Sequence, residues 1–133
     1  MNLQTEMTMG NQTEKFEFNE TGQLIRLNGG QIYLRYVEHQ DGQSTPVKFR
    51  LDGDTVQLDR QGARQTRLVF QEDQETVTRY QTEYGLIHLM VHTNELVKDI
   101  DFANCHGEVS AEYLLKNNVQ VLGTYRIQLQ FQS

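Results

Sequence analysis

Four histidines and one cysteine are the residues of this 133-residue chain best suited to metal binding or nucleophilic chemistry. His88 and His92 are four positions apart, a spacing that on a helix would stack the two rings and let them share a metal ion. On a strand, both rings point to one face about 13 Å apart, from a rise of roughly 3.3 Å per residue. They cannot then bind one ion together, so the sequence predicts no metal site.

The remaining chemical candidates are equally isolated. Cys105 and His106 are adjacent, and neighbouring residues on a strand point to opposite faces, so they cannot form a nucleophile and base pair. We expect Cys105 to be a lone buried thiol and His39 to lie at a solvated turn. Gly29-Gly30 has no following helix and is too short to hold a phosphate. The sequence therefore favours a non-catalytic protein over an enzyme and predicts no cofactor.

Length and charge narrow the function classes further. A chain of 133 residues is long enough to bury a core of its own, so we expect one domain over residues 1–133. The formal charge of −6 disfavours a nucleic-acid partner, whose binding depends on clustered lysine and arginine. We find no run of roughly 20 apolar residues and no export signal, so we expect a cytoplasmic protein without a membrane partner. The sequence sets no oligomeric state.

The elements expected to position any site are strands. Apolar and polar residues alternate through residues 47–51, 56–59, 109–115 and 121–131, the period-two pattern of half-buried strands. Turn signals recur about every ten residues, which is typical of antiparallel sheets. They are Thr21-Gly22, Asn28-Gly29-Gly30, Asp41-Gly42, Asp52-Gly53, Gln61-Gly62, Glu72-Asp73, Tyr84-Gly85 and Asn117-Asn118.

Two hairpins follow from these signals. Asp52-Gly53 predicts a two-residue turn, because both residues tolerate the positive φ that such turns need. Residues 105–115 and 119–132 predict a second hairpin around residues 116–118. Residues 95–101 fit either a helical turn or the end of a strand, and residues 3–18 fit one strand or two.

So many successive antiparallel strands must protect their edges, and closure removes the edges altogether. We therefore predict an all-β fold, a single closed antiparallel up-and-down barrel of about eight to ten strands. A barrel of that size can hold one small ligand or be filled by side chains, and both alternatives remain open here.

The order of several short motifs resembles the bacterial calycin-like barrel family typified by the YwiB protein. The motifs are Ile32 to Glu38, Thr45 with Lys48 and Phe49, Asp59 to Gly62, Leu68 to Phe70, Tyr80 to Gly85, Val91 to Thr93 and Gly107 to Leu115. The likeness covers nearly the whole chain. It implies a lipocalin-like barrel in a family of small cytoplasmic proteins with no established function. One departure is Glu83, where we expect a proline before the tyrosine-glycine corner.

A polar and aromatic set from several strands supplies the candidate ligand-binding residues. Tyrosines combine an apolar body with a polar tip, which suits a binding pocket. The candidates are Tyr36, Glu38, Arg60, Tyr80, Thr82, Tyr84, His88, Met90, Tyr113 and Tyr125. We predict that they line an interior site for a small apolar or amphipathic molecule. The alternative is an interaction or structural protein that has a packed interior and acts through its outer surface.

Overall fold

The computed structural model describes residues 2–9, 15–62, 65–82 and 84–132, and within them every regular element is a β-strand. No helix among these residues is long and apolar enough to cross a membrane. The strands are β1 (Asn2–Met9), β2 (Lys15–Thr21), β3 (Gln23–Arg26), β4 (Ile32–Gln40), β5 (Gln43–Arg50), β6 (Val56–Gln61), β7 (Gln65–Phe70), β8 (Glu75–Thr82), β9 (Gly85–Asp101), β10 (His106–Lys116) and β11 (Val121–Gln132).

The all-β antiparallel class is therefore confirmed, but the strand number exceeds the prediction. Within residues 3–18, the described residues belong to two paired strands, with Leu3 opposite Glu20 and Thr5 opposite Phe18. The chain then breaks at buried Gly22, which separates β2 from the short β3. These two divisions give eleven described strands in place of eight to ten.

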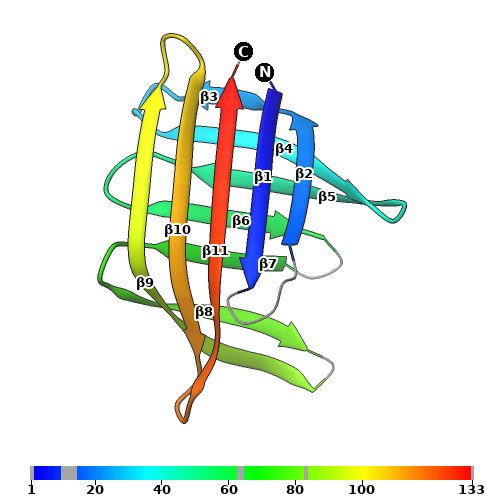
Figure 1. Cartoon of the computed structure of the whole chain (residues 1–133), viewed down its shortest axis with the longest axis vertical. Coiled ribbons are helices and arrows are strands. Elements are labelled where there is room, and N and C mark those ends of the chain that lie inside the picture. Colours follow the sequence, from blue (N-terminus) through cyan, green and yellow to red (C-terminus); the bar gives the residue numbers. More distant parts are fainter. Residues whose placement is uncertain (1, 10–14, 63–64, 83, 133) are drawn as a thin grey trace.

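The strands form two sheets that face each other (Figure 1). One has the order β2-β1-β11-β10-β9-β8, and the other has the order β3-β4-β5-β6-β7. In Figure 1, β1, β2, β10 and β11 stand upright in front, and β3 to β7 run across behind them. No described backbone ladder joins the sheets, so the pairing does not confirm a single closed barrel.

At the junction of β7 and β8, side chains take the place of the missing ladder. Thr76 donates its hydroxyl to the carbonyl of Val69 at 2.7 Å, and Thr78 donates to the carbonyl of Arg67 at 2.5 Å. These bonds satisfy two carbonyls at the free edge of β7. The two sheets are thus joined at this seam by threonine hydroxyls.

The predicted two-residue turn at Asp52-Gly53 is wrong. Arg50 pairs with Gln57, so residues 51–56 lie between the last paired residues of β5 and β6. Leu51 is buried and donates its amide to the carbonyl of Ile32, which draws the chain away from a tight turn. The tight turn is instead Asp41-Gly42, between paired Gln40 and Gln43, where both turn residues have positive φ.

The hairpin of β10 and β11 is confirmed, and residues 95–101 belong to β9. Their ambiguous pattern comes from a bulge. Tyr113 pairs with Thr93 but Glu112 pairs with Glu95, which leaves Asn94 as an extra residue. Before the bulge, odd-numbered residues such as Val91 point inward. After it, even-numbered residues such as Leu96 point inward.

The core lies between the sheets and contains side chains from both. In the β3–β7 sheet its fully buried members include Leu34, Phe49, Val56 and Phe70, and the other sheet contributes Val91, Val109, Ala111, Ile127, Leu129 and Phe131.

Candidate functional site

A buried polar cluster occupies the space between the two sheets. Tyr36 and Glu38 are two residues apart on β4, so their side chains share the inward face. Arg60 joins them from β6, because Tyr36 pairs with Val47 and Val47 pairs with Arg60. Thr5 reaches the cluster from β1 in the opposite sheet. The cluster thus links β1, β4 and β6.

Its hydrogen bonds form a chain. The Tyr36 hydroxyl donates to Oε1 of Glu38 at 3.0 Å, and Arg60 Nη2 donates to the same oxygen at 3.2 Å. Because the tyrosine has only one hydroxyl proton, the Thr5 hydroxyl donates to Tyr36 across their 3.0 Å contact. Oε1 of Glu38 therefore accepts from both neighbours.

Burial opposes the ionisation of this carboxyl group. Glu38 is 5% exposed, and burial raises the pKa of its carboxyl group although Arg60 acts to lower it. Burial, followed by the charge of Glu38, also raises the pKa of Tyr36. The tyrosine therefore remains a protonated donor at neutral pH.

Arg60 is incompletely satisfied in this cluster. Its Nη2 contacts the thioether sulfur of Met7 at 3.0 Å in addition to Glu38. A thioether is a weak acceptor. Its buried Nε has no hydrogen-bond partner. A guanidinium with an unused buried donor is unusual and marks Arg60 as the chemically distinctive residue of the cluster.

A pocket of about 460 Å³, partly open to solvent, extends from Arg60 along the inner faces of both sheets, and we call it the interior pocket. Three tyrosines line it, Tyr80 from β8, Tyr113 from β10 and Tyr125 from β11. Its apolar wall includes Met7, Leu58, Leu68 and Leu115, and no aspartate or glutamate is among its described lining residues. The pocket combines a cation, phenol groups and apolar surface.

Aromatic packing holds the pocket wall in place. The ring of Tyr113 stacks on Tyr125 at 5.4 Å between centroids and contacts Phe70 at 4.8 Å. Burial raises the pKa of Tyr113, with a smaller effect from Tyr80. Burial likewise raises the pKa of Tyr80, so both phenols are neutral donors at pH 7. Among the described lining residues, only Arg60 and Arg126 are charged.

The sequence matches a family described as a domain of unknown function, DUF1934, over residues 1–129. The chain belongs to this family. The fold is similar to that of the ywiB protein from Bacillus subtilis, with a TM-score of 0.76, 22% sequence identity, and coverage of 99% of this chain and 91% of that one. A comparison with curated proteins found no match. The DUF1934 assignment fits the resemblance of the sequence motifs to the family typified by YwiB.

In this DUF1934 chain, six of the ten predicted site residues gather between the sheets. Tyr36, Glu38 and Arg60 form the polar cluster, and Tyr80, Tyr113 and Tyr125 line the pocket beside it. The period-two pattern indicated the inward face for Tyr113 and Tyr125.

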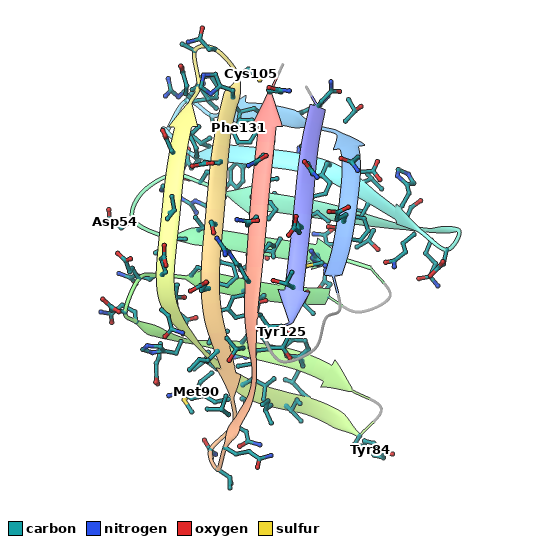
Figure 2. The ribbon with its side chains drawn as sticks, in the orientation of Figure 1. Asp54, Tyr84, Met90, Cys105, Tyr125 and Phe131 are labelled. Atoms are coloured by element: carbon teal, nitrogen blue, oxygen red, sulfur yellow. The ribbon has the colours of Figure 1, made fainter. Side chains whose placement is uncertain are left out.

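The other four residues do not join the site. Tyr84 is 96% exposed at the tip of the β8–β9 hairpin, where Figure 2 shows it pointing away from the body of the protein. On β9 the inward residues are Leu89, Val91 and Thr93, so His88 and Met90 point outward. The side chain of Thr82, and Glu83 as a whole, lie outside the described residues.

The remaining histidines and the cysteine are also dispersed. His39 contacts Glu20 at 3.1 Å in an exposed position, as its place beside a turn predicts. Cys105 is half-buried in a turn with a positive φ of 53°, not on a strand. Among the described residues, no three His, Cys, Asp or Glu side chains are placed to hold a metal ion.

Sequence reasoning missed the contribution of β1. Thr5 bonds Tyr36, and Met7 contacts Arg60, yet neither was a candidate. The alternation of Leu3, Thr5 and Met7 carries the signal, because all three positions share one face of a strand. A buried threonine and a methionine beside an arginine are simply too common to identify a site.

Proposed function

We propose that this protein binds a small amphipathic molecule in the interior pocket. The observation that carries the proposal is a pocket of about 460 Å³ with three tyrosines and Arg60 in its lining and no described carboxylate. Its volume lies within the roughly 300–1,000 Å³ range of small-molecule sites. We place this binding activity in the cytoplasm and in one domain of residues 1–133.

The polar end of the ligand lies beside Arg60. Its guanidinium has more donors than Glu38 and Met7 use, and the buried Nε lacks a partner. The phenols of Tyr80, Tyr113 and Tyr125 offer further hydrogen bonds. Leu58, Leu68 and Leu115 provide the surface for the apolar part. The two facing sheets act in this proposal as a calycin-like barrel around the ligand.

Dodecanoate and dodecanol test the proposal because they share a chain and differ in the head group. We expect isothermal titration calorimetry to detect saturable dodecanoate binding to the wild-type protein. Leu115→Trp fills the pocket and should weaken binding at least tenfold. Leu122→Trp changes an exposed residue outside the pocket and should leave binding unchanged. Circular dichroism confirms the fold of both variants.

Arg60→Met separates the head-group contribution. It should weaken dodecanoate binding more than dodecanol binding, whereas Arg79→Met, at an exposed position on β8, should affect neither. Native mass spectrometry of protein purified from its source cells then looks for a retained small molecule. If neither probe binds saturably and no mass is retained, the pocket is not a ligand site.

A second candidate function is interaction with another protein through the outer surface. One observation favours it, a cross-strand row in which Val77, Met90, Lys116 and Val121 are successive register partners. Val77 is 66% exposed and Val121 is 55% exposed, so the row presents apolar surface to solvent. The occupant we test is a second copy of this chain.

Sedimentation velocity measures this alternative directly. Self-association should appear as the protein concentration increases, and Val77→Lys with Val121→Lys should abolish it. A monomer at every concentration excludes this use of the surface.

A further inference from the structure

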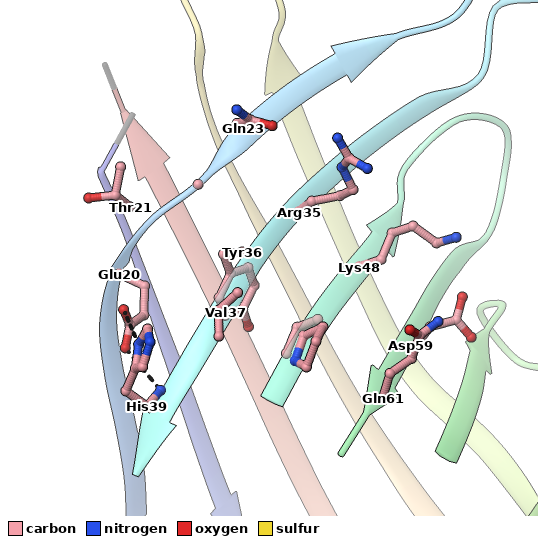
Figure 3. Close-up of a pocket in the computed structure, with 13 residues that line it drawn as sticks. Glu20, Thr21, Gln23, Arg35, Tyr36, Val37, His39, Lys48, Asp59 and Gln61 are labelled. Atoms are coloured by element: carbon pink, nitrogen blue, oxygen red, sulfur yellow. Dashed lines mark hydrogen bonds and ion pairs between the residues drawn. The ribbon is translucent and has the colours of Figure 1, made fainter. Parts of the chain in front are cut away.

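A groove of about 710 Å³ crosses the outer face of the β3–β7 sheet and is separate from the tyrosine pocket (Figure 3). Arg35 of β4 and Lys48 of β5 line it together with Val37 and Pro46. Figure 3 shows the Arg35 and Lys48 side chains extending over the same face. This face is on the opposite side of the sheet from the core, because the alternating residues point inward. These inward residues are Leu34, Tyr36, Val47 and Phe49.

The two cations are direct register partners. Arg35 pairs with Lys48, and both point outward, so their Cβ atoms lie roughly 4.5–5.5 Å apart. Like charges directly opposite each other destabilise a sheet. Among the described residues, neither takes part in an ion pair. The protein therefore places two cations side by side without ion-pair partners although its formal charge is −6.

The carboxylates in the groove are already engaged. Asp59 is the register partner of Lys48, but it accepts from Arg67 at 2.6 Å and from Gln57 at 3.1 Å. Glu20, at the other end of the groove, accepts from the backbone amide of His39 at 3.2 Å and contacts its ring at 3.1 Å. Neither carboxylate forms an ion pair with Arg35 or Lys48.

The next row of the sheet is apolar. Val37 and Pro46 are register partners two residues along from Arg35 and Lys48, and both line the groove. Lys48 also lies over the ring of Tyr33, with its nitrogen 5.2 Å from the centroid. The groove thus offers two positive charges next to a flat apolar surface.

We propose that this outer groove binds a small organic oxyanion, in which a phosphate or carboxylate lies between Arg35 and Lys48 and a flat apolar body covers Val37 and Pro46. The bound oxyanion would remove the repulsion between the two cations. This site is independent of the interior pocket, because the pocket lining includes neither cation.

Phenyl phosphate tests the proposal, with inorganic phosphate and phenol as its two halves. We expect nuclear magnetic resonance titration to show saturable shifts of the Val37 and Lys48 amides with phenyl phosphate, and binding at least tenfold weaker with either half alone. Arg35→Gln and Lys48→Gln should each weaken binding at least tenfold. Arg79→Gln, outside the groove, is the matched control and should not.

A second measurement needs no ligand. Removing one of two opposed like charges should raise the Tm of Arg35→Gln by roughly 1–4 °C, and phenyl phosphate should raise the Tm of the wild type but not of this variant. No saturable shifts, or equal loss of binding in Arg79→Gln, overturns the proposal. Dodecanoate binding should be the same in Arg35→Gln and wild type, so the interior site succeeds or fails separately.

Discussion

Glu38 is a buried carboxyl group whose ionisation is opposed by its surroundings, since burial raises its pKa above the ordinary 4.5. A raised pKa in the folded state stabilises the protein below the unfolded pKa, and this contribution is lost as pH rises through the folded pKa. Glu38→Gln removes it. The free energy of unfolding of wild type minus that of the variant should therefore decrease as pH rises from about 4 to 8.

Urea unfolding at several pH values measures this difference. Glu112→Gln is a suitable control because Glu112 is paired only at 3.9 Å with exposed Arg126. Its difference from wild type should not follow the same curve. Parallel pH profiles for wild type and Glu38→Gln would show that the burial of Glu38 has no effect on its titration.

Asp52 shows the opposite behaviour. Hydrogen bonding from Arg50 lowers the pKa of Asp52 to about 2, and the amide of Ile32 acts in the same direction. A lowered pKa gives stability that is present above the unfolded value of 3.8 and lost as pH falls through about 2. Asp52→Ala should cost about 1 kcal/mol at pH 7, and this cost should shrink toward pH 2.

Exposed Asp54 provides the control, because it lies in the same loop between β5 and β6 (Figure 2). Asp54→Ala should have little effect at either pH. An Asp52→Ala cost that is the same at pH 7 and pH 2 would mean that the carboxylate charge does not matter there.

Among the elements, β7 and β8 meet at a seam where side chains replace a backbone ladder. Thr78 is 2% exposed, and its hydroxyl bonds the carbonyl of Arg67. Thr78→Val keeps the shape and leaves that carbonyl unsatisfied, so we expect a loss of about 1–3 kcal/mol. Native-state hydrogen exchange should also show less protection in β8.

Thr124→Val is the control for the seam, because Thr124 is at an exposed position of β11. This variant should leave both the stability and the hydrogen exchange unchanged. Full retention of β8 protection in Thr78→Val would mean that packing alone joins the sheets at this edge.

The bulge at Asn94 sets which residues of β9 face the core. Deleting Asn94 removes only the extra residue, so Thr93 and Glu95 become neighbours and Leu96, Lys98 and Ile100 stay inward, whereas one alanine inserted between Glu95 and Leu96 would turn these three residues outward. We expect the insertion to abolish cooperative thermal unfolding in circular dichroism and the deletion to retain it. Asn94→Ala keeps the residue count and should fold; an insertion variant as stable as wild type would contradict the assigned register.

The alternation of apolar and polar residues predicted which face of a strand points inward where only one face is apolar. Val109, Ala111, Tyr113 and Leu115 showed their inward face directly, and so did the residues of β11. The faces of His88 and Met90 could not be read, because β9 is apolar on both sides at that point. Asp52-Gly53 failed because the burial of Leu51, a tertiary contact, overrides the local turn preference.

The site was predictable in part for the same reason. Tyr36 and Glu38 lie on β4, and Arg60 lies on β6. The successive hairpins β4–β5 and β5–β6 bring these strands together. Thr5 comes from the other sheet, and no local pattern reveals a contact across 31 positions. Whether the eleven described strands close into one barrel depends on where the backbone pairing between strands stops. No local pattern in the sequence encodes that point.

At the scale of the whole molecule, the two sheets are held by their shared core and by a few polar contacts across it. Lys98 makes one of these, because its ammonium donates to the carbonyl of Leu51 at 2.8 Å and also to the carbonyl of Gly53. The lysine belongs to β9 of one sheet, and the carbonyls belong to the loop after β5 of the other. It therefore fastens the sheets together at that loop.

Lys98→Met tests this fastening. The variant keeps the aliphatic stem but leaves two carbonyls without their charged donor, so we expect a loss of about 1–3 kcal/mol in urea unfolding. Lys116→Met, which breaks only the surface pair with Glu75, should cost much less. Dodecanoate binding should persist in Lys98→Met because Lys98 does not line the pocket. Equal stability losses in the two lysine variants would mean that the core alone holds the sheets together.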